Sequence, residues 1–136
     1  MAALLLLVIV PAGCLTPGSD NCRLDSECPG ECANTGDCVP AGSTRFVRIH
    51  WTVHGATPDE TSCSPIAELE VAFSGDGDGS SYRPVPCEVG QITFTKLPAW
   101  FDTVEVSAWS EAGILLCRFE AAIAEPNLVM SIDLQP

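Results

Sequence analysis

Apolar and polar side chains alternate along most of the chain beyond residue 44. In the stretch 46–54, Val47, Ile49, Trp51 and Val53 fall on one face of an extended backbone, and most of the side chains between them are polar. This period of two is typical of a half-buried β-strand. The pattern recurs in five further segments, and a seventh is interrupted by prolines. The five are 69–73, 92–94, 104–108, 115–123 and 128–134, and the seventh is 82–85.

Turn-forming residues separate these runs. Glycine, proline, aspartate and asparagine gather at 55–59, 75–80, 97–98, 111–113 and 126–127, and such clusters mark the ends of strands. No segment carries an eleven-residue helical repeat of apolar side chains. Six or seven short strands spaced by turns predict an all-β fold, an antiparallel β-sandwich of two sheets over residues 44–136.

Four cysteines crowd the segment that precedes the sandwich. Cys22, Cys28, Cys32 and Cys38 follow a C-x5-C-x3-C-x5-C spacing in a stretch with almost no large apolar side chains. So short a segment cannot fold by hydrophobic burial, and we expect disulfides to order it. Three pairings are open. Zinc is the rival use of four close cysteines, but the spacing lacks the paired C-x2-C ligands of common zinc sites.

Two further cysteines lie in predicted turns. Cys63 and Cys87 bracket the second and third strands, and we predict that they form a disulfide. Cys117 falls on the inward face of its strand and is expected to be a small buried side chain if it stays unpaired. Eight cysteines in 136 residues are typical of an exported chain, because disulfides are rare in reducing compartments.

The first fourteen residues join an apolar run, 2–10, to the sequence Ala12-Gly13-Cys14. The run is far shorter than the roughly 20 residues that span a bilayer as a helix, and it is typical of a signal peptide. The segment resembles bacterial lipoprotein signals. The resemblance implies a signal peptide at 1–13, a lipid on Cys14, and a linker with the Cys-rich segment at 14–43. The alternative is ordinary cleavage after Ala12, which leaves Cys14 as a thiol.

The location expected from these features is the bacterial cell envelope, where the lipid would anchor the chain in the outer membrane. The chain carries 18 acidic and 6 basic residues, and its formal net charge is -12. Such a surface repels nucleic acid, which proteins bind mainly through Lys and Arg. We therefore expect the membrane, through the lipid, and a protein or glycan as partners.

The segment 92–99, Ile-Thr-Phe-Thr-Lys-Leu-Pro-Ala, is followed by a strand at 102–108 and by Gly113. It resembles the F-x-x-L-P-A-G-x-Y-x-V-x-V segment of carboxypeptidase-regulatory-like domains, which are prealbumin-like sandwiches related in shape to Cna-B repeats. The resemblance implies a non-catalytic spacer, stalk or binding module without active-site residues.

Enzymatic chemistry finds little support in the residues. His50 and His54 share a strand face but stand about 13 Å apart, too far for one metal ion. Glu68 and Glu70 share a face about 7 Å apart, as outward carboxylates of a solvated sheet commonly do. No Ser-His-Asp order or phosphate-binding glycine loop is present. We expect no enzyme and no cofactor.

Two features point to ligands. Asp76 and Asp78 lie in a Gly-Asp-Gly-Asp-Gly-Ser stretch that spaces oxygens as calcium loops do, although the twelfth position, where an EF-hand has glutamate, is Cys87. The competing interpretation is a hairpin turn in which Asp-Gly supplies positive φ angles. Trp100 and Trp109 could form a stacking platform for sugar, or pack under a loop.

Taken together, these patterns predict a non-catalytic, lipid-anchored cell-envelope protein whose β-sandwich is a structural or protein-interaction module. The alternative is a secreted carbohydrate- or calcium-binding module.

Overall fold

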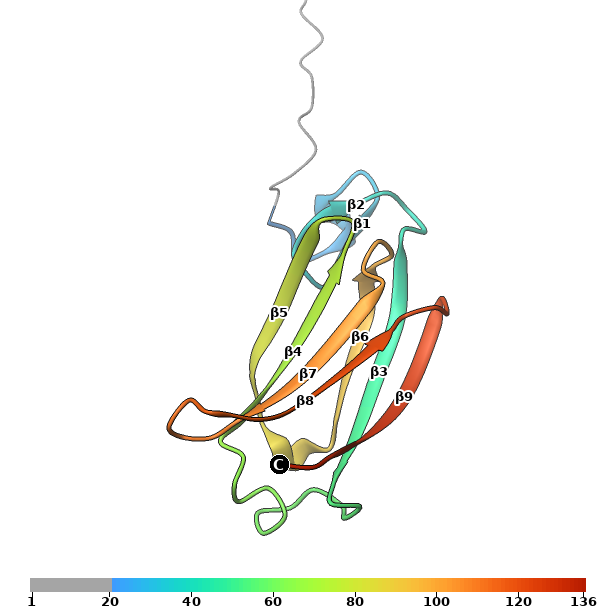
Figure 1. Ribbon diagram of the computed structural model, residues 1–136. Coiled ribbons are helices and arrows are strands. Elements are labelled where there is room, and N and C mark those ends of the chain that lie inside the picture. Colours follow the sequence, from blue (N-terminus) through green and yellow to red (C-terminus); the bar gives the residue numbers. More distant parts are fainter. Residues whose placement is uncertain (1–20) are drawn as a thin grey trace, which may run out of the picture.

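The computed structural model describes residues 21–136 (Figure 1). The signal-peptide and Cys14 predictions fall on residues outside this range. Seven strands form two facing sheets, so the all-β sandwich is confirmed. One sheet has the order β6-β3-β9 and the other β5-β4-β7-β8. Their bounds are β3 Thr44–Val53, β4 Glu68–Gly75, β5 Asp78–Val85, β6 Gln91–Pro98, β7 Thr103–Trp109, β8 Leu115–Ala122 and β9 Asn127–Leu134.

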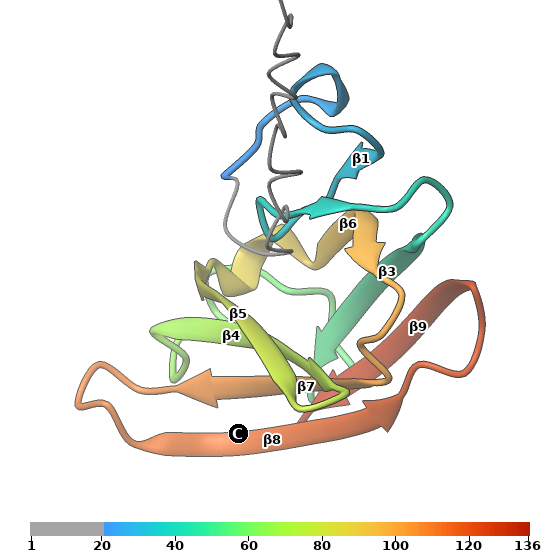
Figure 2. The same ribbon diagram turned by 90° about the horizontal axis from the view of Figure 1, so that it is seen from above.

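Neighbouring strands are antiparallel with one exception. The first and last strands of the sandwich, β3 and β9, run parallel, with Phe46 opposite Asn127 and Val53 opposite Leu134. The alternation did not predict this pair, because it specifies which face a side chain occupies and not the direction of its neighbour. β8 and β9 are edge strands of the two sheets and are not hydrogen-bonded to each other (Figure 2).

The core consists of the inward side chains of both sheets. Val47, Ile49 and Val53 of β3 are fully buried, as the alternation predicts, and so are Leu69 and Val71 of β4. An aromatic group fills the end of the core nearest the β4–β5 turn. It comprises Phe73, Tyr82, Phe94 and Phe101. Among the described residues, no helical segment is long and apolar enough to cross a bilayer.

The predicted loop at 75–80 is shorter than expected. Asp76 and Gly77 alone make the turn, with φ of 50° and 78°, and β5 already begins at Asp78. Two consecutive positive φ angles are what a tight hairpin requires. Gly75 is required for a different reason, which is lack of space. A Cβ atom there would lie 2.1 Å from the backbone oxygen of Trp100. The hairpin therefore packs backbone against backbone on the β6–β7 loop.

Three β-bulges interrupt the strand pairing. In β5 the register against β4 jumps between Leu69 and Val71, within the proline-containing run 82–85. In β6 the register against β3 jumps between Arg45 and Val47, which leaves one extra residue near Lys96. In β8 the register against β7 jumps between Ala108 and Trp109. The bulge in β8 turns Leu115 to the outer face opposite Trp109, where it is 39% exposed. The alternation over 115–123 predicts that Leu115 shares the inward face of Cys117, and this prediction is wrong.

The Cys-rich cap, residues 21–40, contains a 3-10 turn, η1 (Asp25–Glu27), and a two-stranded ribbon, β1 (Glu31–Cys32) and β2 (Cys38–Val39). Disulfides join Cys22 to Cys32 and Cys28 to Cys38, which settles the pairing that the sequence left open. The cap sits on the end of the sandwich where β3 begins (Figure 1).

The predicted disulfide between Cys63 and Cys87 is confirmed. It is buried beside Trp51, whose indole N–H donates to the backbone oxygen of Cys87 at 2.7 Å. Cys87 begins a second 3-10 turn, η2 (Cys87–Val89). Cys117 is the free cysteine of the described residues and lies opposite buried Ala108. It is half-buried, less than expected, and burial raises the pKa of its thiol.

Candidate functional site

The outer face of the four-stranded sheet gathers polar side chains from all four strands, and Glu68, Glu70 and Trp109 of the sequence analysis are among them. Strand alternation turns these side chains away from the core. They are Glu68 and Glu70 from β4, Arg83 from β5, Glu105, Ser107 and Trp109 from β7, and Arg118 from β8. Glu68 lies opposite Trp109, and Glu70 opposite Ser107. Residues distant in sequence therefore meet on one surface.

Trp109 lies under a basic side chain. The guanidinium carbon of Arg83 is 5.3 Å from the centroid of the indole, a cation–π distance. Arg83 also forms ion pairs with Glu68 and, at 3.8 Å, with Glu70. The two glutamates thus share one cation, which does not suit them to act as an acid–base pair. The indole N–H of Trp109 is buried without a hydrogen-bond partner.

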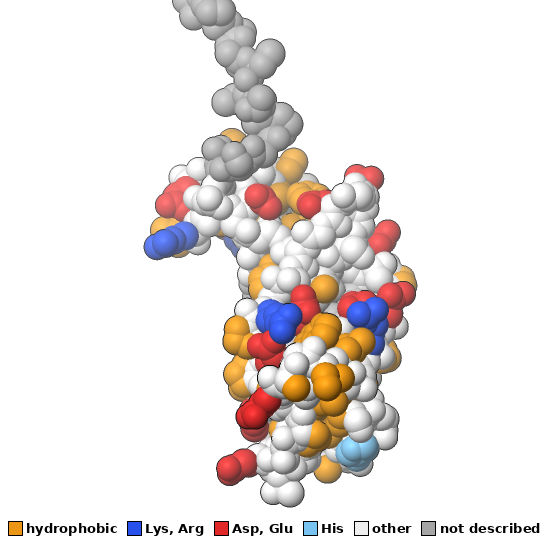
Figure 3. Space-filling view, turned by 60° about the vertical axis from the view of Figure 1, so that its left-hand side comes forward, with side chains coloured by type: hydrophobic (Ala, Val, Ile, Leu, Met, Phe, Trp, Pro, Cys, Tyr) orange, Lys and Arg blue, Asp and Glu red, His pale blue; other side chains and the backbone are white. Residues whose placement is uncertain are grey.

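An apolar patch adjoins this ion cluster. We call Trp109, Ile114, Leu115 and Leu116 the outer-face patch. Ile114 is 62% exposed, Leu115 is 39% exposed, and Trp109 and Leu116 are half-buried. Figure 3 shows hydrophobic side chains gathered on the lower part of the molecule, with basic and acidic groups above and beside them. An apolar centre with a charged rim is the usual composition of a protein–protein contact.

A second ion cluster borders the patch on β8. The Nε of Arg118 lies 3.2 Å from Oε1 of Glu105, and the hydroxyl of Ser107 donates to the same oxygen at 3.0 Å. Glu120 lies directly opposite Glu105. Within residues 21–136, Glu120 has no ion-pair partner, so two like charges face each other across β7 and β8.

The two candidate tryptophans are not brought together. Trp109 ends β7, whereas Trp100 lies in the loop before β7 begins, near the β4–β5 turn. The indole N–H of Trp100 donates to Oδ2 of Asp78 at 3.2 Å. Oδ1 of the same carboxylate accepts from the Gly79 amide at 2.8 Å. Both oxygens of this calcium candidate are thus hydrogen-bonded within the chain, and Asp76 is exposed in the turn.

The histidines lie apart, as expected. His50 is on β3, and His54 follows the end of that strand with a φ of 50°. Nδ1 of His54 is 3.0 Å from Oε1 of Gln135. These positions give the pair no common ligand.

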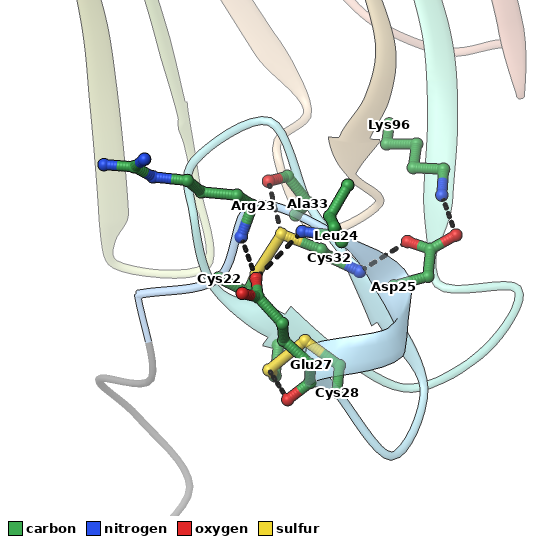
Figure 4. The surroundings of a disulfide bond; sticks show 10 residues. Cys22, Arg23, Leu24, Asp25, Glu27, Cys28, Cys32, Ala33 and Lys96 are labelled. Carbon is green, nitrogen blue, oxygen red and sulfur yellow. Dashed lines mark hydrogen bonds and ion pairs between the residues drawn. A yellow bond between two sulfur atoms is a disulfide. The ribbon is translucent and has the colours of Figure 1, made fainter.

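A shallow groove of about 510 Å³ runs between the cap and β6. Figure 4 shows Asp25 at its wall, accepting from the Cys32 amide at 2.9 Å and from the Lys96 ammonium. These hydrogen bonds, that from Lys96 first, lower the pKa of Asp25. The sulfur atoms of Cys22, Cys28 and Cys32 lie within 4.8 Å of one another. All three are in disulfides, so they offer no thiolate ligands to a metal.

Leu115 and Leu116 are the members of the patch that the strand pattern hid. The signal was three successive apolar residues, 114–116, which break the alternation where β8 bulges. A comparison of the chain with protein-family models and with curated proteins finds no match.

Proposed function

We propose that this is a lipid-anchored protein of the bacterial cell envelope, held in the outer membrane, whose sandwich is a non-catalytic protein-interaction module. The observation that carries the proposal is the outer-face patch. Its exposed leucine and isoleucine stand beside Trp109 between two ion clusters. Soluble domains rarely gather apolar side chains on one exposed surface unless that surface contacts a partner.

The position of the patch suits an anchored module. The cap and the β7–β8 hairpin lie at opposite ends of the molecule (Figure 1). Cys14 precedes Cys22 of the cap by only eight residues. A lipid on Cys14 would therefore tether the cap end and leave the patch on the side remote from the tether. The disulfides of the cap agree with an oxidising exterior.

The proposed module agrees with the resemblance to carboxypeptidase-regulatory-like domains. The segment that carries the resemblance, 92–99, forms most of β6 and the start of the loop to β7. The alternative, a secreted module for sugar or calcium, is less favoured. Trp100 and Trp109 stand at opposite ends of β7, and Asp78 is engaged by Trp100 and Gly79.

The anchor is tested by the intact mass of the protein after export in a bacterium with an outer membrane. We expect a mature chain that begins at Cys14 and carries added acyl mass, recovered in the outer-membrane fraction. Cys14→Ser should abolish the acyl mass, and Cys117→Ser, the matched control, should retain it. An unacylated chain beginning at Gly13 would overturn the anchor.

The surface is tested with a photo-crosslinking amino acid placed singly in the anchored protein. At Leu115 we expect adducts of defined mass with an envelope protein. At Val129, which is 62% exposed on the other sheet, we expect at least about tenfold less adduct. Equal labelling at the two positions, or none at Leu115, contradicts an interaction module centred on this patch.

A further inference from the structure

The free edge of β8 offers a complete strand for pairing. β8 is the last strand of its sheet and runs for eight residues without glycine or proline. Figure 2 shows it along the rim of the molecule. The opposite edge, β5, contains Gly79 and Pro84, and such residues discourage pairing with another strand. The edge strand β6 of the other sheet is partly covered, because Asn34 of the cap forms hydrogen bonds with the backbone of Lys96.

Pairing at this edge would also cover apolar side chains. Phe119 of β8 and Met130 of β9 pack against the core but remain half-buried. The exposed edge therefore combines unpaired backbone groups with incompletely buried side chains. Both properties favour the addition of a strand.

The charged side chains of β8, Arg118 and Glu120, favour pairing with a second copy of β8 in one particular register. Two copies of β8 can pair antiparallel around a twofold axis perpendicular to the sheet. The outward side chains of both copies then lie on the same face of the joined sheet only if one residue lies opposite its own copy at the axis. An axis at Arg118 opposes the two arginines, and an axis at Glu120 opposes the two glutamates. An axis at Phe119 places Arg118 of each copy opposite Glu120 of the other. Only this central register pairs opposite charges, which stabilise cross-strand neighbours.

The fold already leaves both charges available. Glu120 faces Glu105 across the sheet and has no basic partner in the described part of the chain. The side chain of Arg118 is 51% exposed although it contacts Glu105. β9, the free edge of the other sheet, carries only one charged residue, Asp133, so no register of β9 with itself pairs opposite charges.

We propose that two copies of this protein pair antiparallel through β8, with Phe119 on the twofold axis. The two four-stranded sheets then form one continuous sheet of eight strands. This contact uses the edge of the sheet and not the outer-face patch. It holds whether or not Cys14 carries lipid, and it can therefore fail or succeed independently of the proposed function.

The register is tested by a disulfide that only this arrangement allows. It places Cys117 opposite Ala121 of the second copy. Within one chain the two positions are about 13 Å apart, too far for a disulfide. We expect the exported full chain with Ala121→Cys to form a covalent dimer under mild copper–phenanthroline oxidation. Ala121→Cys combined with Cys117→Ser, and the wild type, should each give at least tenfold less dimer on a non-reducing gel.

A second pair tests the same register on the outer face. Leu116 lies opposite Ala122 of the second copy, so Leu116→Cys with Ala122→Cys in a Cys117→Ser background should also cross-link. This pair keeps the test open if Ala121→Cys does not fold. Folding of each variant is checked by near-ultraviolet circular dichroism. A folded protein that gives no dimer with either pair overturns the proposal, and so does a wild-type dimer joined through Cys117 itself.

The charge rule is tested in the Ala121→Cys protein. Arg118→Glu and Glu120→Arg each place like charges opposite each other, and each should reduce the yield of dimer at least fivefold. The double variant with both changes restores opposite pairs and should recover the yield. Yields that do not respond to either single change, or that stay low in the double variant, contradict the register.

Discussion

Asn34 of the cap and Lys96 of β6 exchange two hydrogen bonds. The Asn34 amide donates to the backbone oxygen of Lys96 at 2.8 Å, and the Lys96 amide donates to Oδ1 of Asn34 at 2.6 Å. The bulge in β6 explains why these groups are available, because the extra residue interrupts the pairing with β3. Asn34 thereby satisfies the backbone N–H and C=O groups of Lys96, which the bulge leaves without partners in β3, and it attaches the cap to the sandwich.

Asn34→Ala should weaken this junction. The variant removes the acceptor of the Lys96 amide but keeps the other bond, so we expect a loss of about 1 kcal/mol. Urea unfolding measures the loss, and amide hydrogen exchange at Lys96 should accelerate. Asn127→Ala is the matched control, because Asn127 is exposed and its side chain makes none of the hydrogen bonds found for the described residues. Equal effects of the two changes would contradict the role of Asn34.

The sandwich was predictable because alternation alone determines most of it. Val47, Ile49 and Val53 are buried as the period of two requires. The same rule failed at Leu115. One extra residue in β8 reverses the face of the residue before it, and the regular alternation of the partner strand β7 does not indicate where that extra residue lies. The parallel pairing of β3 with β9 could not be predicted either, because it joins segments about 80 residues apart and alternation within each segment does not specify which strands pair.

The candidate site was predictable only in part. Trp109 stands on the outward parity of a regular strand, so its exposure to the outer face followed from the sequence. Its contact with Arg83 depends on the pairing of β4 with β5 and β7, which alternation does not specify. Trp100 lies in a loop without periodicity, and its contact with Asp78 requires the close approach at Gly75.

Acid should destabilise the contacts between the cap and the sandwich. Hydrogen bonds from Lys96 and the Cys32 amide lower the pKa of Asp25 below 3.8, and those from the Gly42 amide and the Thr44 hydroxyl lower the pKa of Glu31 below 4.5. A carboxyl whose pKa is lower in the folded state stabilises that state above its unfolded pKa. This stabilisation is lost as pH falls through the folded pKa.

The cap should therefore be most stable above the ordinary pKa values of these two carboxyls, and it should lose stability as pH falls below them through the lowered pKa values of the folded state. The chemical shift of the Cys32 amide, followed by nuclear magnetic resonance, should titrate with a midpoint below 3.8. Asp25→Asn should abolish this titration, whereas Asp76→Asn, an exposed aspartate of the β4–β5 turn, should leave it unchanged. A midpoint above 3.8 contradicts the contacts assigned to Asp25.

Gly75→Ala should damage the hairpin more than Gly77→Ala. A Cβ at Gly75 would meet backbone atoms of the β6–β7 loop, which cannot move aside as a side chain can, and we expect a loss of about 3 kcal/mol. Gly77 has a φ of 78° and open space around it, so its replacement should lose only about 1 kcal/mol. Urea unfolding of the two variants compares them directly, and the reverse order contradicts the close contact.

The buried disulfide should stabilise the sandwich, and the cap disulfides should act locally. Cys63 and Cys87 are 24 residues apart, and a cross-link of that length contributes about 3 to 4 kcal/mol by restricting the unfolded chain. Replacing both by alanine should lower the free energy of unfolding by that amount and also disturb the acceptor of the Trp51 indole. Replacing Cys22 and Cys32 should instead raise amide exchange in residues 21–40 and leave the nuclear magnetic resonance signal of the Trp51 indole N–H unchanged. If the two double variants unfold the sandwich equally, the cap and the core share one stabilising unit, contrary to this assignment.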